Sequence, residues 1–203
     1  ALKRAGHQVK ILDLRISNSP DEELNAVMNS FDPQVVGIGV MTIECKYGFI
    51  DAAKVKKINP NVTVIFGGPH CSHEPQFILN DSNVDLMVSG EGDLTIVELV
   101  NTLEEGKDVA GVPGIAYKKN GSYLRTAERP VIRDLDTIDQ EYDLINLEKY
   151  FNFQSSMDFF PVFRNKKFIP LVTSRGCPFK CTYCHDIFDK SIQYRSPEAV
   201  VNE

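Results

Sequence analysis

Short apolar runs alternate with helical patterns through the first half of this chain. Where a strand is followed by a helix and then by another strand, the two strands lie in one parallel sheet and the helix covers a face of it. The pattern therefore predicts an α/β fold with a doubly wound parallel sheet that has helices on both sides. The predicted strands are residues 9–14, 35–40, 62–66 and 86–88, and the predicted helices are residues 19–30, 44–58, 75–79 and 93–105.

Two of these elements have strong local signals. Residues 35–40 form a continuous apolar run, which is typical of a strand that is buried on both faces. The first predicted helix starts with a serine cap at Ser19, followed by Pro20 in the first turn and Glu22 three residues after the cap. This combination is a common helix start, since the acid can bond back to the cap residue.

The last predicted helix and a hairpin follow one another. The helix begins at Asp93 and ends at Gly106, a residue that suits the C-terminal cap. Asn120-Gly121 then lies between two short β-type runs and predicts a type I′ hairpin, because both turn positions need a positive φ. The apolar face predicted for the helix consists of Ile96, Val97, Val100 and Leu103.

Charge and cysteine content exclude several classes of protein. The 203 residues have a formal net charge of -6, which disfavours a nucleic-acid groove or an anionic membrane surface as partner. No apolar run approaches the roughly 20 residues of a membrane span, and no signal segment is apparent at the start. The five cysteines are odd in number, which does not fit a secreted disulfide framework. A reducing cytoplasmic location fits better.

The carboxyl ends of the predicted strands indicate where a ligand would bind. In open α/β sheets ligands bind in the crevice beyond these ends. The loops at that edge are residues 39–42, 67–70 and 90–92, and each contains glycine. We therefore expect the binding site of this domain to be formed by these three loops.

Cys177, Cys181 and Cys184 lie in the spacing C-x3-C-x2-C. Three thiolates on one loop can bind three corners of a 4Fe-4S cluster and leave the fourth iron open to a substrate. Zinc is the alternative metal, but it usually takes four ligands in separated pairs, and only His185 could be the fourth here. A third interpretation is a loop with no metal.

The cysteine loop resembles that of the radical S-adenosylmethionine superfamily, in which the spacing follows a strand and an aromatic residue precedes the last cysteine. This resemblance implies that Cys177, Cys181 and Cys184 are the cluster ligands and the catalytic centre, and that Tyr183 lies beside the adenine. It also implies that residues 168–172 are the first strand of a partial barrel. In the family the open iron binds S-adenosylmethionine, and an electron from the cluster cleaves it to a 5′-deoxyadenosyl radical. A reducing donor such as flavodoxin or ferredoxin is then a partner.

The α/β domain in front of the loop narrows the resemblance to the cobalamin-dependent members of that superfamily. The segments 37–42 and 67–70 resemble loops that meet the nucleotide tail of cobalamin, and residues 90–93 resemble the G-E-G-(D/E) turn of the subfamily. In the paired-glycine turn a side chain would collide with the tail. The cobalamin contacts that the resemblance implies are Gly39, Met41, Thr42, Gly67, Gly68, Pro69, His70, Gly90, Glu91 and Gly92.

The sequence differs from relatives in the subfamily at two points, one near the nucleotide tail of cobalamin and one near the cobalt. Gly39 stands where many relatives have serine, and no D-x-H-x-x-G motif supplies a histidine ligand. We therefore expect a cobalt without a histidine ligand. His70 and His73, with Cys71 between them, suggest a second metal site less strongly than a polar loop near the corrin. Cys45 is predicted to be a buried helix residue.

The predicted domains are a cobalamin-binding α/β domain with a C-terminal hairpin at residues 1–129, a linker rich in aromatic residues at 130–166, and the start of a radical S-adenosylmethionine domain at 167–203. Both ends of the chain have the patterns of interrupted helices, so we interpret it as a fragment. The first strand of a flavodoxin-like 2-1-3-4-5 sheet would then lie upstream of Ala1, in the centre of the sheet. We predict that this polypeptide alone is poorly stable and does not hold cobalamin.

The expected activity is methyl transfer to an unactivated carbon of a small-molecule substrate that the sequence does not identify. A radical oxidative cyclase of the bacteriochlorophyll-synthesis type is the alternative enzyme, because it uses the same parts in this stretch. A cobalamin- or nucleotide-binding module with a zinc knuckle is the alternative without catalysis. Iron and sulfide content distinguishes the enzymes from this module.

Overall fold

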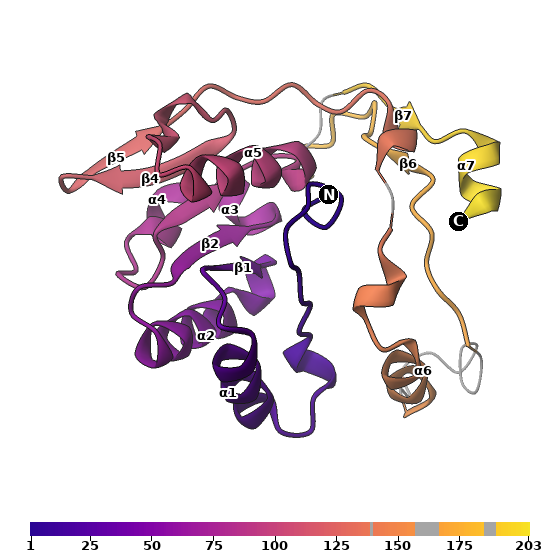
Figure 1. The fold of residues 1–203 in the computed structure, drawn as a ribbon. Coiled ribbons are helices and arrows are strands. Elements are labelled where there is room, and N and C mark those ends of the chain that lie inside the picture. Colours follow the sequence, from indigo (N-terminus) through magenta and orange to yellow (C-terminus); the bar gives the residue numbers. More distant parts are fainter. Residues whose placement is uncertain (139, 157–166, 185–189) are drawn as a thin grey trace.

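A computed structural model describes residues 1–203 except 139, 157–166 and 185–189 (Figure 1). Its main sheet has five strands in the order β1-β2-β3-β4-β5. The first three strands are parallel neighbours, and the last two form an antiparallel hairpin that extends the sheet beside β3. The strands are β1 (Val35–Gly39), β2 (Thr63–Gly67), β3 (Leu86–Val88), β4 (Ile115–Lys119) and β5 (Ser122–Arg125).

Helices cover both faces of this sheet. Residues of α1, α2, α3 and α4 pack in one buried cluster, and residues of α5 pack in a second cluster on the other face (Figure 1). The helices are α1 (Pro20–Phe31), α2 (Cys45–Ile58), α3 (Pro69–His73), α4 (Pro75–Leu79), α5 (Gly92–Glu104), α6 (Leu147–Ser156) and α7 (Pro197–Asn202). Single 3-10 turns occur at Leu14–Ile16, Thr42–Glu44, Val109–Gly111, Leu135–Thr137 and Tyr142–Leu144.

Side chains along β2 alternate between the two buried clusters. Val64 and Phe66 lie in the cluster with α1 to α4, whereas Ile65 lies in the cluster with α5. Met87 in β3 belongs to the first cluster and its neighbours Leu86 and Val88 to the second. Successive side chains of a strand point to opposite faces, so a sheet that is covered on both sides needs apolar residues at every position. The predicted doubly wound α/β fold is confirmed.

The predicted hairpin is also confirmed. Asn120 and Gly121 have φ values of 54° and 77°, as a type I′ turn requires. The predicted helix that ends at Gly106 is present as α5, but its deepest side chains are Thr95 and Leu99 rather than the predicted face. Ile96 and Leu103 of that face are half-buried against the second cluster.

Two predicted strands are wrong. Residues 9–13 have no regular structure and continue into a 3-10 turn, and residues 168–172 have none either. The second segment leads into the two-residue strand β6 (Ser174–Arg175), which pairs with β7 (Gln193–Tyr194). Apolar β-type residues become a strand only where another backbone is available for the ladder, and neither segment has one among the described residues.

Strand β1 does not have the two buried faces that were predicted. Gly37 and Gly39 are exposed, and Val36 and Ile38 are only half-buried. The reason is its position at the edge of the described sheet, with β2 as its one neighbour. The prediction of a further strand beside it stays a prediction.

Three details of the helices differ from the predictions. The helix α1 begins at Pro20 as predicted, but the Ser19 hydroxyl makes no capping hydrogen bond. The helices α3 and α6 were not predicted. The first falls in a predicted loop and the second in the predicted linker, where its aromatic residues show no clear helical period.

Candidate functional site

The loops at the carboxyl ends of β1 and β2 lie against each other. Thr42 Oγ1 is 3.2 Å from His70 Nδ1, and the Val40 amide donates to the Gly67 carbonyl at 2.8 Å. The third predicted loop joins them through α3, because the Gly90 amide donates to Ser72 Oγ at 2.9 Å. The structure thus brings together the three loops that the sequence indicated.

The glycines of these loops fall into two groups. At Gly39 and Gly67 an added Cβ would have no atom within 4 Å, so both open onto space that the described residues leave empty. Gly68 instead has φ +103°, and a Cβ there would lie 2.7 Å from the Val40 carbonyl oxygen. Its lack of a side chain is therefore required by the fold itself, apart from any ligand.

A pocket of about 580 Å³ opens beside the Thr42–His70 pair, between α2 and the α3–α4 segment. His70 Nε2 is buried and has no hydrogen-bond partner among the described residues, and the His70 ring packs edge-on against Phe77. Buried polar atoms usually have a hydrogen-bond partner, so this nitrogen fits a site in which a bound ligand would supply the partner. The pocket is lined by Thr42, Cys45, Lys46, Phe49, Ile50, His70 and Phe77.

Three further predicted contacts, Met41, Pro69 and Gly92, have different environments. Met41 is exposed beside the site, whereas Pro69 is half-buried at the first position of α3. Gly92 begins α5 and packs 3.7 Å from a Val88 methyl group, measured from its ideal Cβ. Of these three residues, Met41 has the side chain most open to a ligand.

The three loop cysteines are exposed and form no disulfide. The Cys184 amide donates to the Cys181 carbonyl at 3.1 Å, which places these two residues on one turn. Among the described residues, no three His, Cys, Asp or Glu side chains are grouped closely enough to hold a metal ion. The structure therefore does not bring the three thiols to one point. Three soft thiol donors on an exposed loop still fit an iron–sulfur cluster by their chemistry, since such sites usually assemble around the metal.

Tyr183 follows the same pattern as the thiols, with 90% of its surface exposed. His185, considered as a fourth zinc ligand, lies outside the described residues. The two other cysteines are different. Cys45 in α2 is buried as predicted, and burial, with a smaller effect from Cys45, raises the pKa of Cys71 to about 12. Burial also raises the pKa of Cys45, so both are inert thiols at neutral pH.

The Glu91 carboxylate is bonded to other groups of the protein and does not face open space. Its carboxylate accepts from the Ile132 amide at 2.5 Å and from Arg175 Nη1 at 2.9 Å. The same Arg175 nitrogen donates to Asp93 at 2.8 Å. Burial lowers the pKa of Arg175, but the hydrogen bonds that Arg175 donates to Asp93 and Glu91 outweigh this effect and raise the pKa. Arg175 is not among the predicted site residues, and its position just before Gly176-Cys177 is the one feature of the sequence that points to it.

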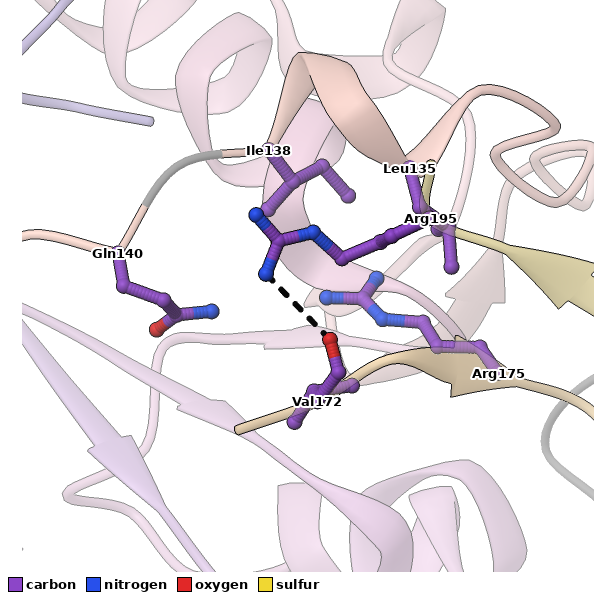
Figure 2. A pocket seen from close by; sticks show the side chains of 6 residues that line it. All are labelled: Leu135, Ile138, Gln140, Val172, Arg175 and Arg195. Atoms are coloured by element: carbon purple, nitrogen blue, oxygen red, sulfur yellow. Dashed lines mark hydrogen bonds between the residues drawn. The ribbon is translucent and has the colours of Figure 1, made fainter. Parts of the chain in front are cut away.

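Beside Arg175 lies a second, much smaller pocket of about 10 Å³, which is room for one water molecule. Figure 2 shows Arg175 and Arg195 side by side there, with Arg195 Nη1 donating to the Val172 carbonyl at 3.4 Å. Arg195 also pairs with Glu203, and both side chains are largely buried. This pocket is a packing gap beneath the start of the cysteine loop and is lined by Leu135, Ile138, Gln140, Val172, Arg175 and Arg195.

Comparisons with known proteins agree with this architecture. The sequence model of the B12 binding domain matches residues 1–100. An uncharacterized methyltransferase of Pyrococcus horikoshii is 35% identical over an alignment of 208 positions, which covers 100% of this chain and 43% of that protein. The anaerobic magnesium-protoporphyrin IX monomethyl ester cyclase of Synechocystis is 28% identical over 187 residues, 89% of this chain and 35% of that protein.

A solved structure shares the fold. The radical S-adenosylmethionine methyltransferase TsrM from Kitasatospora setae, with tryptophan substrate and a SAM analog bound, has a TM-score of 0.76 and 20% identity. The similarity covers 100% of this chain and 40% of that chain. The chain thus spans less than half the length of the relatives that it matches. Residues 1–100 belong to the B12 binding domain family, and the chain is similar to a methyltransferase and to a cyclase. Among the described residues, no helix has the length and apolar character of a membrane span.

Proposed function

We propose that the full-length protein is a cobalamin-dependent radical S-adenosylmethionine enzyme that transfers a methyl group to an unactivated carbon of a small molecule. The observation that carries this proposal is the order of two parts in one chain. A domain matched by the B12 binding family comes first, and the C-x3-C-x2-C loop follows at Cys177 to Cys184. Neither part alone specifies the chemistry.

Cys177, Cys181 and Cys184 would hold a 4Fe-4S cluster in this enzyme, with S-adenosylmethionine on the open iron and Tyr183 beside its adenine. Such a cluster supplies one electron for the reductive cleavage of S-adenosylmethionine. Exposure of the three thiols supports the proposal, because ligands to an added cluster must be reachable. The electron would come from a reducing cytoplasmic donor such as flavodoxin or ferredoxin.

The α/β domain would hold cobalamin at the carboxyl edge of its sheet. Gly39 and Gly67 leave the space that a bound tail would fill, and His70 brings a buried nitrogen without a partner to the pocket beside it. Met41, Thr42, Pro69, Gly90 and Gly92 complete the proposed contacts. Gly68 and Glu91 would act indirectly, since the first packs on Val40 and the second is engaged by Ile132 and Arg175.

Radical oxidative cyclisation is the second candidate reaction. It is favoured by the 28% identity to the magnesium-protoporphyrin cyclase, which extends over 89% of this chain. The products distinguish the two reactions. A methyltransferase adds one carbon to its substrate, whereas an oxidative cyclase forms a ring with no added carbon.

The experiment is anaerobic reconstitution of the full-length protein with iron and sulfide, followed by addition of S-adenosylmethionine and a strong reductant. We expect 5′-deoxyadenosine or a methylated product, together with broad absorbance near ~400 nm from the cluster. Cys181→Ala should abolish both signals, whereas the matched variant Cys45→Ala should retain the cluster absorbance, because Cys45 lies in α2 outside the loop. Cleavage by Cys181→Ala at the level of the unmodified protein would refute the proposal.

A further inference from the structure

A shielded charge network joins the start of α5 to the start of the cysteine loop. Arg175 Nη1 lies 2.9 Å from Glu91 Oε1 and 2.8 Å from Asp93 Oδ2. The Glu91 side chain is 4% exposed and that of Arg175 is 19% exposed. Both carboxylates belong to the N-terminal end of α5, where the helix dipole stabilises negative charge. One guanidinium is thus held by two acids on a rigid element.

The contacts around this network close into a ring. The second oxygen of Glu91 accepts from the Ile132 amide, and the next residue, Arg133, donates to Ser191 Oγ at 2.5 Å. The Ser191 carbonyl in turn lies so close to Gly176 that no side chain would fit there. Gly176 also has φ +97°, a conformation that glycine adopts without strain. Residues far apart in the sequence therefore fix Arg175 and Gly176 from both sides.

The cysteine loop itself has few such contacts. Phe179 is 70% exposed, and the three cysteines are exposed as well. Cys177 follows directly after Gly176, so the direction in which the loop leaves the domain is set at the anchored pair. We name Glu91, Asp93, Arg175 and Gly176 the loop anchor.

We propose that Arg175 is a positioning residue, which through Glu91 and Asp93 fixes the cysteine loop relative to the carboxyl edge of the sheet. This inference rests on the proposed function, which assigns a cluster to the loop and cobalamin to the edge of the sheet. It explains why Glu91 and Asp93 lie in the turn that follows β3, since Gly90 of that turn bonds to α3 beside the cobalamin-side loops. The loop anchor sets the separation of the two cofactors.

The first test is hydrogen exchange in the full-length protein without added cofactors. In Arg175→Gln we expect the amides of residues 173–177 to exchange about tenfold faster, because the buried network that holds them is lost. Arg175→Lys should fall between this variant and the unmodified protein, since lysine keeps the positive charge but lacks the guanidinium whose Nη1 bonds both acids. Amides of β2 serve as the measure of intact folding.

The matched control is Glu98→Gln. Glu98 also lies on α5 and also pairs with an arginine, Arg129, of the segment that follows the hairpin, but it does not contact the cysteine loop. This variant should leave exchange at residues 173–177 unchanged. If Arg175→Gln does not fold, Asp93→Asn replaces it, with an expected acceleration of about threefold because Glu91 remains. Equal exchange in the anchor variants and the unmodified protein would overturn the proposal.

The second test uses the reconstituted, cobalamin-loaded protein. The magnetic interaction between the reduced cluster and Co(II), measured by electron paramagnetic resonance, depends on their separation. We expect it to change in Arg175→Gln at unchanged iron and cobalt content, and to be unaltered in Glu98→Gln. An identical interaction in all three proteins would also overturn the proposal. If the unmodified protein binds neither metal, the proposed function fails, while the exchange experiment still decides the anchor.

Discussion

The α/β body, which is the chain up to the end of β5, and the cysteine region at residues 167–184 and 190–203 differ in the burial of their apolar side chains. In the body Phe66, Ile78 and Ile115 are completely buried between the sheet and its helices. In the cysteine region Leu171, Val172, Phe179 and Tyr183 are all exposed. The body is thus held by its own core, whereas no apolar side chain is buried among the described residues of the cysteine region.

The largest expected effect comes from a matched pair of phenylalanines. Phe66→Ala should lower the free energy of unfolding by about 3–5 kcal/mol, since it opens a cavity in the core of the sheet. Phe179→Ala should change it by less than about 0.5 kcal/mol, because its ring already lies in water. Urea unfolding of the full-length protein, followed by circular dichroism, measures both. A loss of several kcal/mol for Phe179→Ala would remove the difference between the two regions.

The adjacent glycines of the β2 turn give the next effect. Gly68→Ala should cost about 1–3 kcal/mol, because its Cβ would meet the Val40 carbonyl and its φ is positive. Gly67→Ala should leave stability within about 0.5 kcal/mol but weaken cobalamin binding, since the space above it is open in the protein. Thermal melting tests the expected change in stability, and cobalamin titration tests the expected change in affinity. Unchanged cobalamin affinity in Gly67→Ala would remove Gly67 from the site.

The smallest effect concerns the contact between the body and α6. Hydrogen bonds from Arg15 hold the pKa of Asp13 below its ordinary value of 3.8, and Tyr150 of α6 also donates to this carboxylate, at 3.2 Å. Because the folded-state pKa is lowered, the stabilisation is present above about pH 4 and is lost as the pH falls through the folded value. It should amount to less than about 1 kcal/mol, since solvent screens the pair.

The measurement is urea unfolding of the unmodified protein and of Asp13→Asn at pH 7 and at pH 2. The difference between the two proteins should be present at pH 7 and should decrease as the pH falls below about 4, because protonation of Asp13 then favours the unfolded state. A difference that grows as the pH falls would contradict the assigned direction of the pKa shift.

The sequence predicts most accurately the elements that depend on interactions between residues close together in the chain. Strand β3 at Leu86–Val88 has the predicted bounds, and the Asn120-Gly121 turn has the predicted backbone geometry. The segments 9–14 and 168–172 are predicted as strands from their β-type residues. A strand also needs a neighbouring backbone, which a pattern within one segment does not supply. Local propensity and the presence of a partner are separate conditions.

The candidate site likewise has one part that the sequence predicts and another that it does not. The loops at the ends of β1, β2 and β3 could be placed together from topology alone, because parallel strands end at one edge. The contact between Arg175 and Glu91 joins residues 84 positions apart, so neither composition nor periodicity indicates it. Gly68 was predicted to make room for a ligand, whereas the structure shows that its own backbone neighbour Val40 already requires the glycine.

The central claim is that one chain holds a cluster on its cysteine loop and cobalamin at the edge of its sheet. The most direct test is metal analysis of the anaerobically reconstituted full-length protein after removal of unbound cofactors. We expect about four iron atoms and one cobalt atom per chain, with the iron lost in Cys181→Ala and the cobalt retained. One zinc atom per chain with neither iron nor cobalt would contradict the claim.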